Sequence, residues 1–176
     1  MIYTVECSYS DSGTEDEWNA FYSHEKLHAL ISVQGFLTSQ RFRLLRGHDA
    51  TPTYLAIHSI TATDILEGQD YRRNGGGNFA RWQPMITHWR RNIYEGVERF
   101  PSIEEGEYVL ASEDHGGPLS GLGLTVWHLR AIGLDRSPAE RCIAIARTAR
   151  EFPENPERER LCVYVPMGEQ LQSPYP

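Results

Sequence analysis

The order of hydrophobic patterns along the first half of the chain is the sequence feature that most restricts its fold. Residues 2–9 alternate between the two faces of an extended chain, as a β-strand does. A helical spacing follows over residues 15–34, and residues 36–45 and 53–60 predict two further strands. Residues 79–95 carry apolar side chains three and four positions apart, which predicts a second amphipathic helix. The order strand, helix, strand, strand, helix therefore predicts an α+β domain.

A fourth strand completes this predicted unit. Residues 107–112 supply it, which gives the split β-α-β arrangement of a ferredoxin-like unit over residues 1–115. The antiparallel sheet of such a unit carries helices on one face only, so its other face must be covered. Pairing with a second chain is the common solution. We therefore expect a homodimer whose sheets form a dimeric α/β barrel with a pocket inside.

The last third of the chain predicts a smaller β-α-β extension over residues 116–176. Residues 124–132 and 161–165 have strand-like patterns, and residues 137–152 have a helical one. Ser137 is a suitable N-cap for that helix, with a proline at the first helical position. The extension resembles half of a second, similar unit in the same domain.

Composition and charge exclude several classes of function. The chain has 176 residues and a net charge of −7, without the basic face that binding to nucleic acid requires. No apolar run approaches the roughly 20 residues of a membrane span, and the N-terminus lacks the pattern of a signal peptide. Cys7, Cys142 and Cys162 are odd in number and widely spaced, which argues against a disulfide framework. We expect a cytoplasmic protein without nucleic-acid or membrane partners.

The string His24-Glu25-Lys26-Leu27-His28 matches the H-E-x-x-H pattern. On a helix, two histidines four positions apart can bind one zinc ion, while the glutamate acts as general base on the metal-bound water. The sequence offers no clear third ligand; Glu67 and Asp70 are the weak candidates. One alternative is therefore a metal-dependent hydrolase or lyase with zinc or another divalent metal on His24 and His28. The other is an exposed helical turn that carries polar residues.

The same segment resembles a known family. Residues 18–36, WNAFYSHEKLHALISVQGF, are similar to the first helix and second strand of EthD-like proteins in the dimeric α+β barrel superfamily. Residues 54–67 are similar to that family's third strand and the loop after it. Two positions depart from the pattern: the family's histidine falls on Lys26, and the proline after it falls on His28. The resemblance therefore supports the fold more strongly than it supports any catalytic residue.

The resemblance implies a range of activities on small aromatic or cyclic compounds. It includes cofactor-free cyclases, isomerases, decarboxylases and lyases, and the superfamily also contains quinone-forming oxygenases and haem-binding peroxidases. We expect an enzyme of the lyase or isomerase type that uses general acid/base chemistry and no organic cofactor, with a metal as the alternative ahead of haem. A second alternative is a non-enzymatic, stress-related barrel that binds a small molecule.

Four residues are the candidates for catalysis. His28 or His58 would transfer the proton, because imidazole titrates near neutral pH. Glu25 would set a histidine tautomer or act as base, and Tyr22 would orient the substrate.

Four further residues are the candidates for substrate binding. Strand alternation allows Glu6 and Arg43, like His58, to point into the barrel, and Arg43 could hold a substrate carboxylate with two hydrogen bonds. Tyr54 would lie beside His58. Trp82 belongs to an aromatic stripe that either packs in the core or forms a platform for the ligand.

Overall fold

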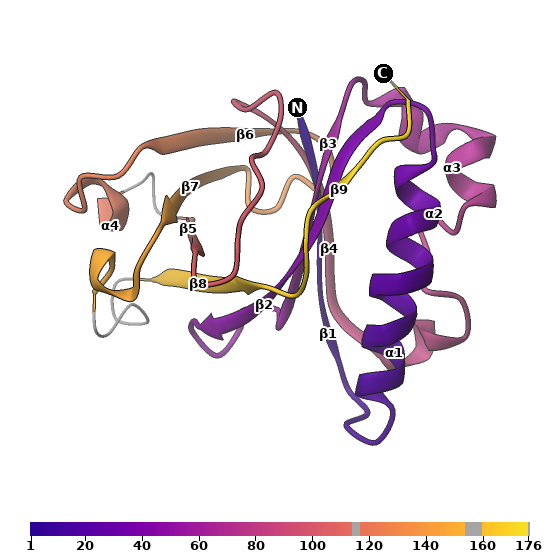
Figure 1. Ribbon diagram of the computed structural model, residues 1–176, viewed down its shortest axis with the longest axis horizontal. Helices are drawn as coiled ribbons and strands as arrows, with labels where there is room; N and C mark the ends of the chain where they lie inside the picture. Colours follow the sequence, from indigo (N-terminus) through magenta and orange to yellow (C-terminus); the bar gives the residue numbers. More distant parts are fainter. Residues whose placement is uncertain (114–116, 154–159, 176) are drawn as a thin grey trace.

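The described strands form one antiparallel sheet that closes on itself. The computed structural model describes residues 1–113, 117–153 and 160–175. Its strands are β1 Ile2–Tyr9, β2 Phe36–Arg46, β3 Tyr54–Ile60, β4 Ile86–Glu95, β5 Tyr108–Ser112, β6 Val126–Leu134, β7 Glu140–Ala146, β8 Leu161–Pro166 and β9 Leu171–Gln172. They are ordered β3-β1-β4-β6-β7-β5-β8-β2-β9, and β2 also pairs with β3. That last pairing joins eight of the described strands into a barrel, with β9 added along β2 (Figure 1).

The barrel closes within a single chain. Strands β4-β1-β3-β2 form one wall, and β6, β7, β5 and β8 complete the ring. The predicted antiparallel α+β barrel is thus confirmed at the level of its sheet. A second chain is not needed to cover the inner face of this sheet, because β5–β8 cover it. The homodimer stays a prediction, as does the domain boundary near residue 115.

One long helix covers the outside of the first wall. It consists of α1 Glu15–Phe21, a π-helical turn η1 Tyr22–Lys26 and α2 Leu27–Ile31, which run on continuously in Figure 1. Acidic residues occupy its first turn, where the helix dipole favours negative charge. Shorter helices follow: η2 Asp64–Glu67, α3 Gln69–Arg73, η3 Ala80–Met85, α4 Gly117–Ser120 and η4 Ala149–Glu151. No described helix is long and apolar enough to cross a membrane.

Strand alternation divides the interior into two main cores. On β1, Tyr3, Val5 and Cys7 face the long helix, whereas Ile2 points into the barrel. The helix-side core also contains Trp18, Tyr22, Leu27, Leu30, Phe36, Tyr54, Tyr71, Phe79, Trp82 and Ile93. The barrel core contains Phe42, Leu55, Ile57, Tyr94, Phe100, Ile103, Val109, Leu129, Ile143 and Tyr164. A third, smaller core lies on the outer face of β5, β7 and β8.

The helix predicted over residues 79–95 is wrong, because Ile86–Glu95 is strand β4. Trp89 and Ile93 are four positions apart, a spacing that fits both a helix and a strand of period two. The strand places both on the helix side, while the intervening Asn92 is buried on the barrel face. Pro84 lies inside the short helix η3, where it offers no backbone N–H, and strand β4 begins two residues later.

The helix predicted over residues 137–152 is also wrong. Its central part, Glu140–Ala146, is strand β7, with Ile143 in the barrel core and Ala144 in the outer core. Ser137 caps no helix; its N–H donates to Asn92 Oδ1, and its carbonyl accepts a hydrogen bond from Asn92 Nδ2. Residues 143–146 alternate between isoleucine and alanine and are apolar on both faces of the strand. A continuous apolar run of this kind fits a buried helix as well as a buried strand.

Candidate functional site

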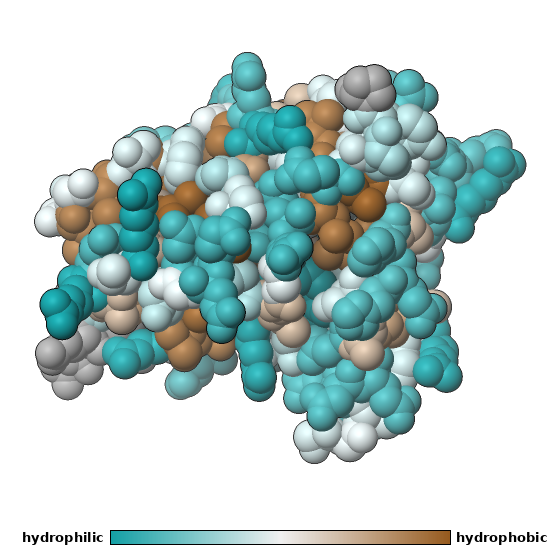
Figure 2. Space-filling view, in the orientation of Figure 1, coloured by the Kyte–Doolittle hydropathy of each residue, from teal (hydrophilic) through white to brown (hydrophobic). Residues whose placement is uncertain are grey.

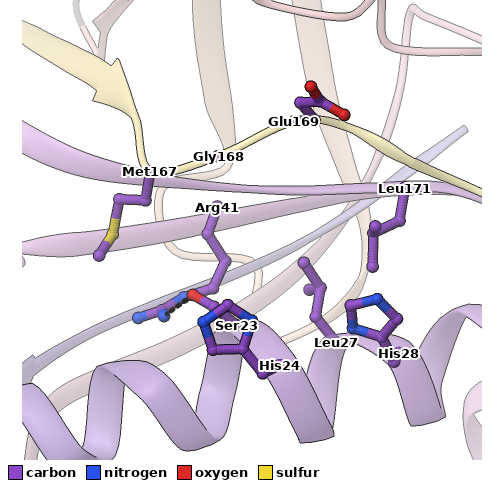
Figure 3. Close-up of a pocket in the computed structure, with 9 residues that line it drawn as sticks. All are labelled: Ser23, His24, Leu27, His28, Arg41, Met167, Gly168, Glu169 and Leu171. Carbon is purple, nitrogen blue, oxygen red and sulfur yellow. Dashed lines mark hydrogen bonds between the residues drawn. The ribbon is translucent and has the colours of Figure 1, made fainter.

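A cleft of about 250 Å³ lies between the long helix and the chain segment that follows β8. Its lining residues are Ser23, His24, Leu27, His28, Arg41, Met167, Gly168, Glu169 and Leu171 (Figure 3). We call it the helix cleft. Polar groups come mainly from the helix and β2, and apolar ones from Leu27, Met167 and Leu171. Figure 2 shows apolar surface beside the helix on this face of the molecule.

The π-helical turn places both motif histidines on the cleft. His24 lies within that turn and His28 in the first turn of α2, and Figure 3 shows both rings on the side of the helix that faces β2. Glu25 lies on another face of the helix, against a second hollow that also borders Trp82. Turns of π-helix are rare and occur often at functional sites. The motif thus gives two imidazoles in one cleft, with the intervening carboxylate outside it.

Arg41 is the buried charge of the cleft. It extends from β2, is 3% exposed, and donates from Nη1 to the Asn19 carbonyl at 3.1 Å and to Ser23 Oγ at 2.9 Å. Its Nη2 donates to Asn19 Oδ1 at 2.8 Å, and its guanidinium carbon lies 4.1 Å from the centre of the Tyr22 ring. Burial lowers the pKa of Arg41. Among the described residues, no carboxylate forms an ion pair with it.

Lys26 is a second buried cation on the inner side of the same helix. Its Nζ donates to the carbonyls of Gly75 and Asn78 and lies 5.1 Å from the centre of the Phe79 ring. Burial lowers the pKa of Lys26 to about 8. Among the described residues, the buried acid is Glu6, which lies in the barrel. The helix-side core therefore holds two cations without a buried carboxylate to balance them.

A glycine loop covers Lys26. Gly75 and Gly77 have φ values of +77° and +75°, which favour glycine. At Gly76, a Cβ atom would approach the Tyr71 ring to 2.4 Å, so no larger residue fits without displacing that ring. The loop thus supplies backbone carbonyls to the ammonium group from close range.

Two of the predicted catalytic residues are buried on the helix side of the sheet. Tyr22 packs in the helix-side core, and burial raises the pKa of its hydroxyl, which has no hydrogen-bond partner in the described part of the chain. His58 also lies on the helix side, contrary to its expected position in the barrel. Its Nδ1 forms a hydrogen bond with Ser39 Oγ at 2.8 Å, and its ring stacks on Tyr3 at 5.3 Å. Burial lowers the pKa of His58 to about 3, which keeps it neutral near pH 7.

The predicted substrate-binding residues separate into different places. Tyr54 links β3 to the helix, because its hydroxyl donates to Glu15 Oε1 at 2.6 Å and accepts from Asn19 Nδ2 at 2.9 Å. Arg43 is exposed near the end of β2 and does not line the helix cleft. Trp82 packs in the helix-side core, with the Arg81 guanidinium 4.3 Å from its ring centre.

Glu6 points into the barrel, as its strand position allowed. Arg141 Nη2 donates to both of its carboxylate oxygens, at 2.9 and 3.1 Å, and Arg90 Nη2 donates to Oε1 at 3.3 Å. Burial alone would lower the pKa of Arg141, but the negative charge of Glu6 raises it, and the pKa ends above its ordinary value. These contacts lie inside the ring of strands, so Glu6 is separated from the helix cleft by β1.

Sequence reasoning missed Arg41 and the segment 167–171. Arg41 stands two positions from Arg43 on the same strand face, so alternation makes both arginines candidates but does not choose between them. The segment joins the site because β9 pairs with β2, at Thr38 and Ser39. That pairing spans more than 130 residues of chain and leaves no local signal.

The alternative metal site has two potential ligands in place. His24 and His28 line the same cleft, but no cluster of three or more His, Cys, Asp or Glu side chains is found among the described residues. A metal on these histidines would need further ligands from water or substrate. The residues thus fit a complete protein-built zinc site poorly, and metal binding stays a prediction.

Comparison with solved structures shows that proteins of low sequence identity share the fold of this chain. A candidate monooxygenase from Fusobacterium nucleatum is 9% identical, with a TM-score of 0.54 over 98% of this chain and 94% of that one. An anthrone oxidase-like protein is 12% identical, with a TM-score of 0.51 over 98% and 93% of the two chains. A candidate chlorite dismutase is 12% identical, with a TM-score of 0.51 over 95% of this chain and 95% of that one. No protein-family model and no curated protein sequence matches the chain.

Proposed function

We propose that this chain is an enzyme that binds a small aromatic or cyclic organic anion in the helix cleft and transfers a proton on it. The main support for this proposal is Arg41, whose guanidinium is buried at the cleft without a carboxylate partner in the described chain. Removing a charge from water is costly unless an opposite charge or strong hydrogen bonds replace the solvent. A carboxylate, phenolate or enolate of the substrate would supply that charge, and a guanidinium binds such oxygens well.

The two histidines supply the proton chemistry. His24 and His28 line the same cleft as Arg41. A neutral imidazole would accept a proton from a hydroxyl or an acidic carbon of the bound ring. Arg41 would stabilise the oxyanion that forms. Return of the proton at another atom gives isomerisation, and loss of a leaving group from the anion gives elimination.

Roles for the remaining predicted residues follow from this geometry. His28 is the preferred base, with His24 as its partner across one helical turn. Tyr22 would position Arg41 through ring contact, because its hydroxyl does not reach the cleft lining. The EthD-like assignment belongs to this proposal and rests on residues 18–36 and 54–67.

Oxidation of the same type of anion is a second candidate. The names of the structural neighbours, monooxygenase and anthrone oxidase-like, favour it. Both reactions begin with removal of a proton from a ring compound. Oxidation additionally consumes dioxygen, which an oxygen electrode records directly.

Deuterium exchange tests the proposal before the natural substrate is known. A panel of hydroxyaromatic acids and unsaturated lactones would be incubated with the protein in D2O and followed by mass spectrometry. We expect exchange or conversion of at least one compound, with a loss of about a hundredfold in His28→Gln. His48→Gln is the matched control, because His48 is exposed and lies outside the cleft.

Two results would count against the proposal. Equal rates in wild type and His28→Gln would remove the histidine from the mechanism. A compound that binds through Arg41 yet is recovered unchanged, without exchange, would instead support the non-enzymatic binding protein.

A further inference from the structure

Another hollow, of about 520 Å³, lies at the barrel, away from the helix cleft and from the hollow beside Glu25. Leu124, Trp127 and Ile145 form its apolar floor, and Glu107, Arg147 and Glu151 are among its polar residues. We call it the barrel-mouth pocket. Pro101, Ser102 and Glu107 line it from the segment between β4 and β5, which in Figure 1 runs from the level of β6 toward β8. On the left of Figure 2, over the half of the molecule that contains β5–β8, apolar side chains (brown) lie recessed between hydrophilic ones.

The floor of the pocket is continuous with the barrel core. Trp127 and Ile145 pack against that core from β6 and β7, and both keep part of their surface accessible. The Trp127 ring lies 6.2 Å from the ring of Phe100, which is itself buried. Buried contacts thus hold the indole in place while part of it borders the pocket. An aromatic surface of this kind favours a flat ring that can stack on it.

The charged residues of the pocket give it a negative balance. Glu107 Oε2 accepts a hydrogen bond from the backbone N–H of Glu104 at 2.9 Å. Glu151 Oε2 accepts one from the backbone N–H of Arg147 at 2.7 Å. Each carboxylate is thereby held through its Oε2 atom. The described hydrogen bonds do not use Oε1 of Glu107 or of Glu151, so these two oxygens can accept hydrogen bonds from a ligand. Two carboxylates against one guanidinium favour a cation.

We propose that the barrel-mouth pocket binds a small aromatic amine in its protonated form. The ring stacks on Trp127, and the ammonium group pairs with Glu107 and Glu151. The volume falls within the range of pockets that bind small molecules. This site shares no lining residue with the helix cleft and takes the opposite charge, so it does not depend on the function proposed above.

Three indole compounds of different charge test this site by isothermal titration calorimetry. Tryptamine is the cation, 3-methylindole is neutral and indole-3-acetate is the anion. We expect tryptamine to bind at one site per chain, about tenfold or more tightly than indole-3-acetate. Trp127→Leu should weaken tryptamine binding about tenfold. Glu107→Gln combined with Glu151→Gln should weaken tryptamine and leave 3-methylindole unchanged.

Controls separate this site from the helix cleft and from unfolding. Arg41→Met should bind tryptamine like wild type. If Trp127→Leu does not fold, the variant with Glu107→Gln and Glu151→Gln still tests the site. Saturable binding that survives both Trp127→Leu and the glutamine variants would overturn the proposal. So would absence of saturable tryptamine binding, or equal affinities for tryptamine and indole-3-acetate.

Discussion

The guanidinium of Arg41 lies over the ring of Tyr22, with 4.1 Å between its central carbon and the ring centre, and both side chains are buried. Trp18 and Tyr54 bring two more rings to 5.1 and 5.5 Å from the same carbon. Aromatic faces attract a cation and hold its plane, but they do not neutralise it. The rings around Arg41 therefore leave the positive charge of its guanidinium without a neutralising partner at the helix cleft.

The hydroxyl of Tyr22 gives the first prediction. It is buried without a partner in the described chain, so Tyr22→Phe removes an unsatisfied polar group and keeps the ring over Arg41. We expect the free energy of unfolding to stay constant or rise by about 1 kcal/mol. Tyr54→Phe is the matched control and should lose about 1 kcal/mol, because its hydroxyl bonds to Glu15 and Asn19. Urea denaturation measures both, and a larger loss in Tyr22→Phe would contradict the assignment.

Lys26 predicts a rise in stability with alkaline pH. Its pKa is about 8 in the folded chain, against an ordinary value of 10.5. Between these values the unfolded chain binds a proton that the folded chain has released, so the free energy of unfolding increases with pH. The increase is up to about 3 kcal/mol from this group. Lys26→Met should lack it.

Buried tyrosines and cysteines act in the opposite direction at high pH, because burial raises their pKa values. The measured quantity is therefore the difference between wild type and Lys26→Met, taken by urea denaturation from pH 7 to pH 10. A difference that does not change with pH would show that Lys26 keeps its ordinary pKa.

His58 predicts sensitivity to acid. Its pKa of about 3 lies below the ordinary 6.5, so between these values the unfolded chain takes up a proton that the folded chain does not. Stability is complete above pH 6.5 and falls as the pH drops toward 3, by up to about 5 kcal/mol from this group. His58→Asn should flatten that slope in thermal denaturation scans. Equal slopes in variant and wild type would place the acid sensitivity elsewhere.

The Glu6–Arg141 pair predicts strong coupling inside the barrel. Glu6→Gln leaves buried Arg141 with Glu113 at 3.4 Å, and Arg141→Met leaves buried Glu6 with Arg90 at 3.3 Å. Each single change removes the shortest ion pair of its partner, at 2.9 Å, and should cost up to about 3–5 kcal/mol. The double variant should cost clearly less than the sum of the two single ones. A double-mutant cycle by urea denaturation measures the difference. Additive losses would mean that the two groups do not interact in solution.

The sequence predicted the strand and helix order of the wall that carries the site. Residues 2–9, 36–45 and 53–60 became β1, β2 and β3 with small shifts at their ends. The predicted helices at 79–95 and 137–152 failed because part of each strand, residues 92–94 of β4 and residues 141–144 of β7, is buried on two faces. An apolar residue every fourth position then satisfies period two and helical period alike.

The candidate site could be predicted only in its local part. His24 and His28 share a face because of their spacing on one helix, so the motif identified them. The wall opposite them depends on β9 pairing with β2 over a large sequence distance. Which of Arg41 and Arg43 reaches the cleft depends on where the helix crosses β2, and a pattern of alternation carries no such information.

Ligand binding at Arg41 shows whether the helix cleft holds an organic anion. Isothermal titration calorimetry would compare 1-hydroxy-2-naphthoate with its neutral amide on wild type, Arg41→Met and Arg43→Met. Arg43 is the matched control because it is an exposed arginine on the same strand. We expect the acid to bind more tightly than the amide, Arg41→Met to lose this preference, and Arg43→Met to keep it. Equal binding of the acid by wild type and Arg41→Met would contradict this expectation.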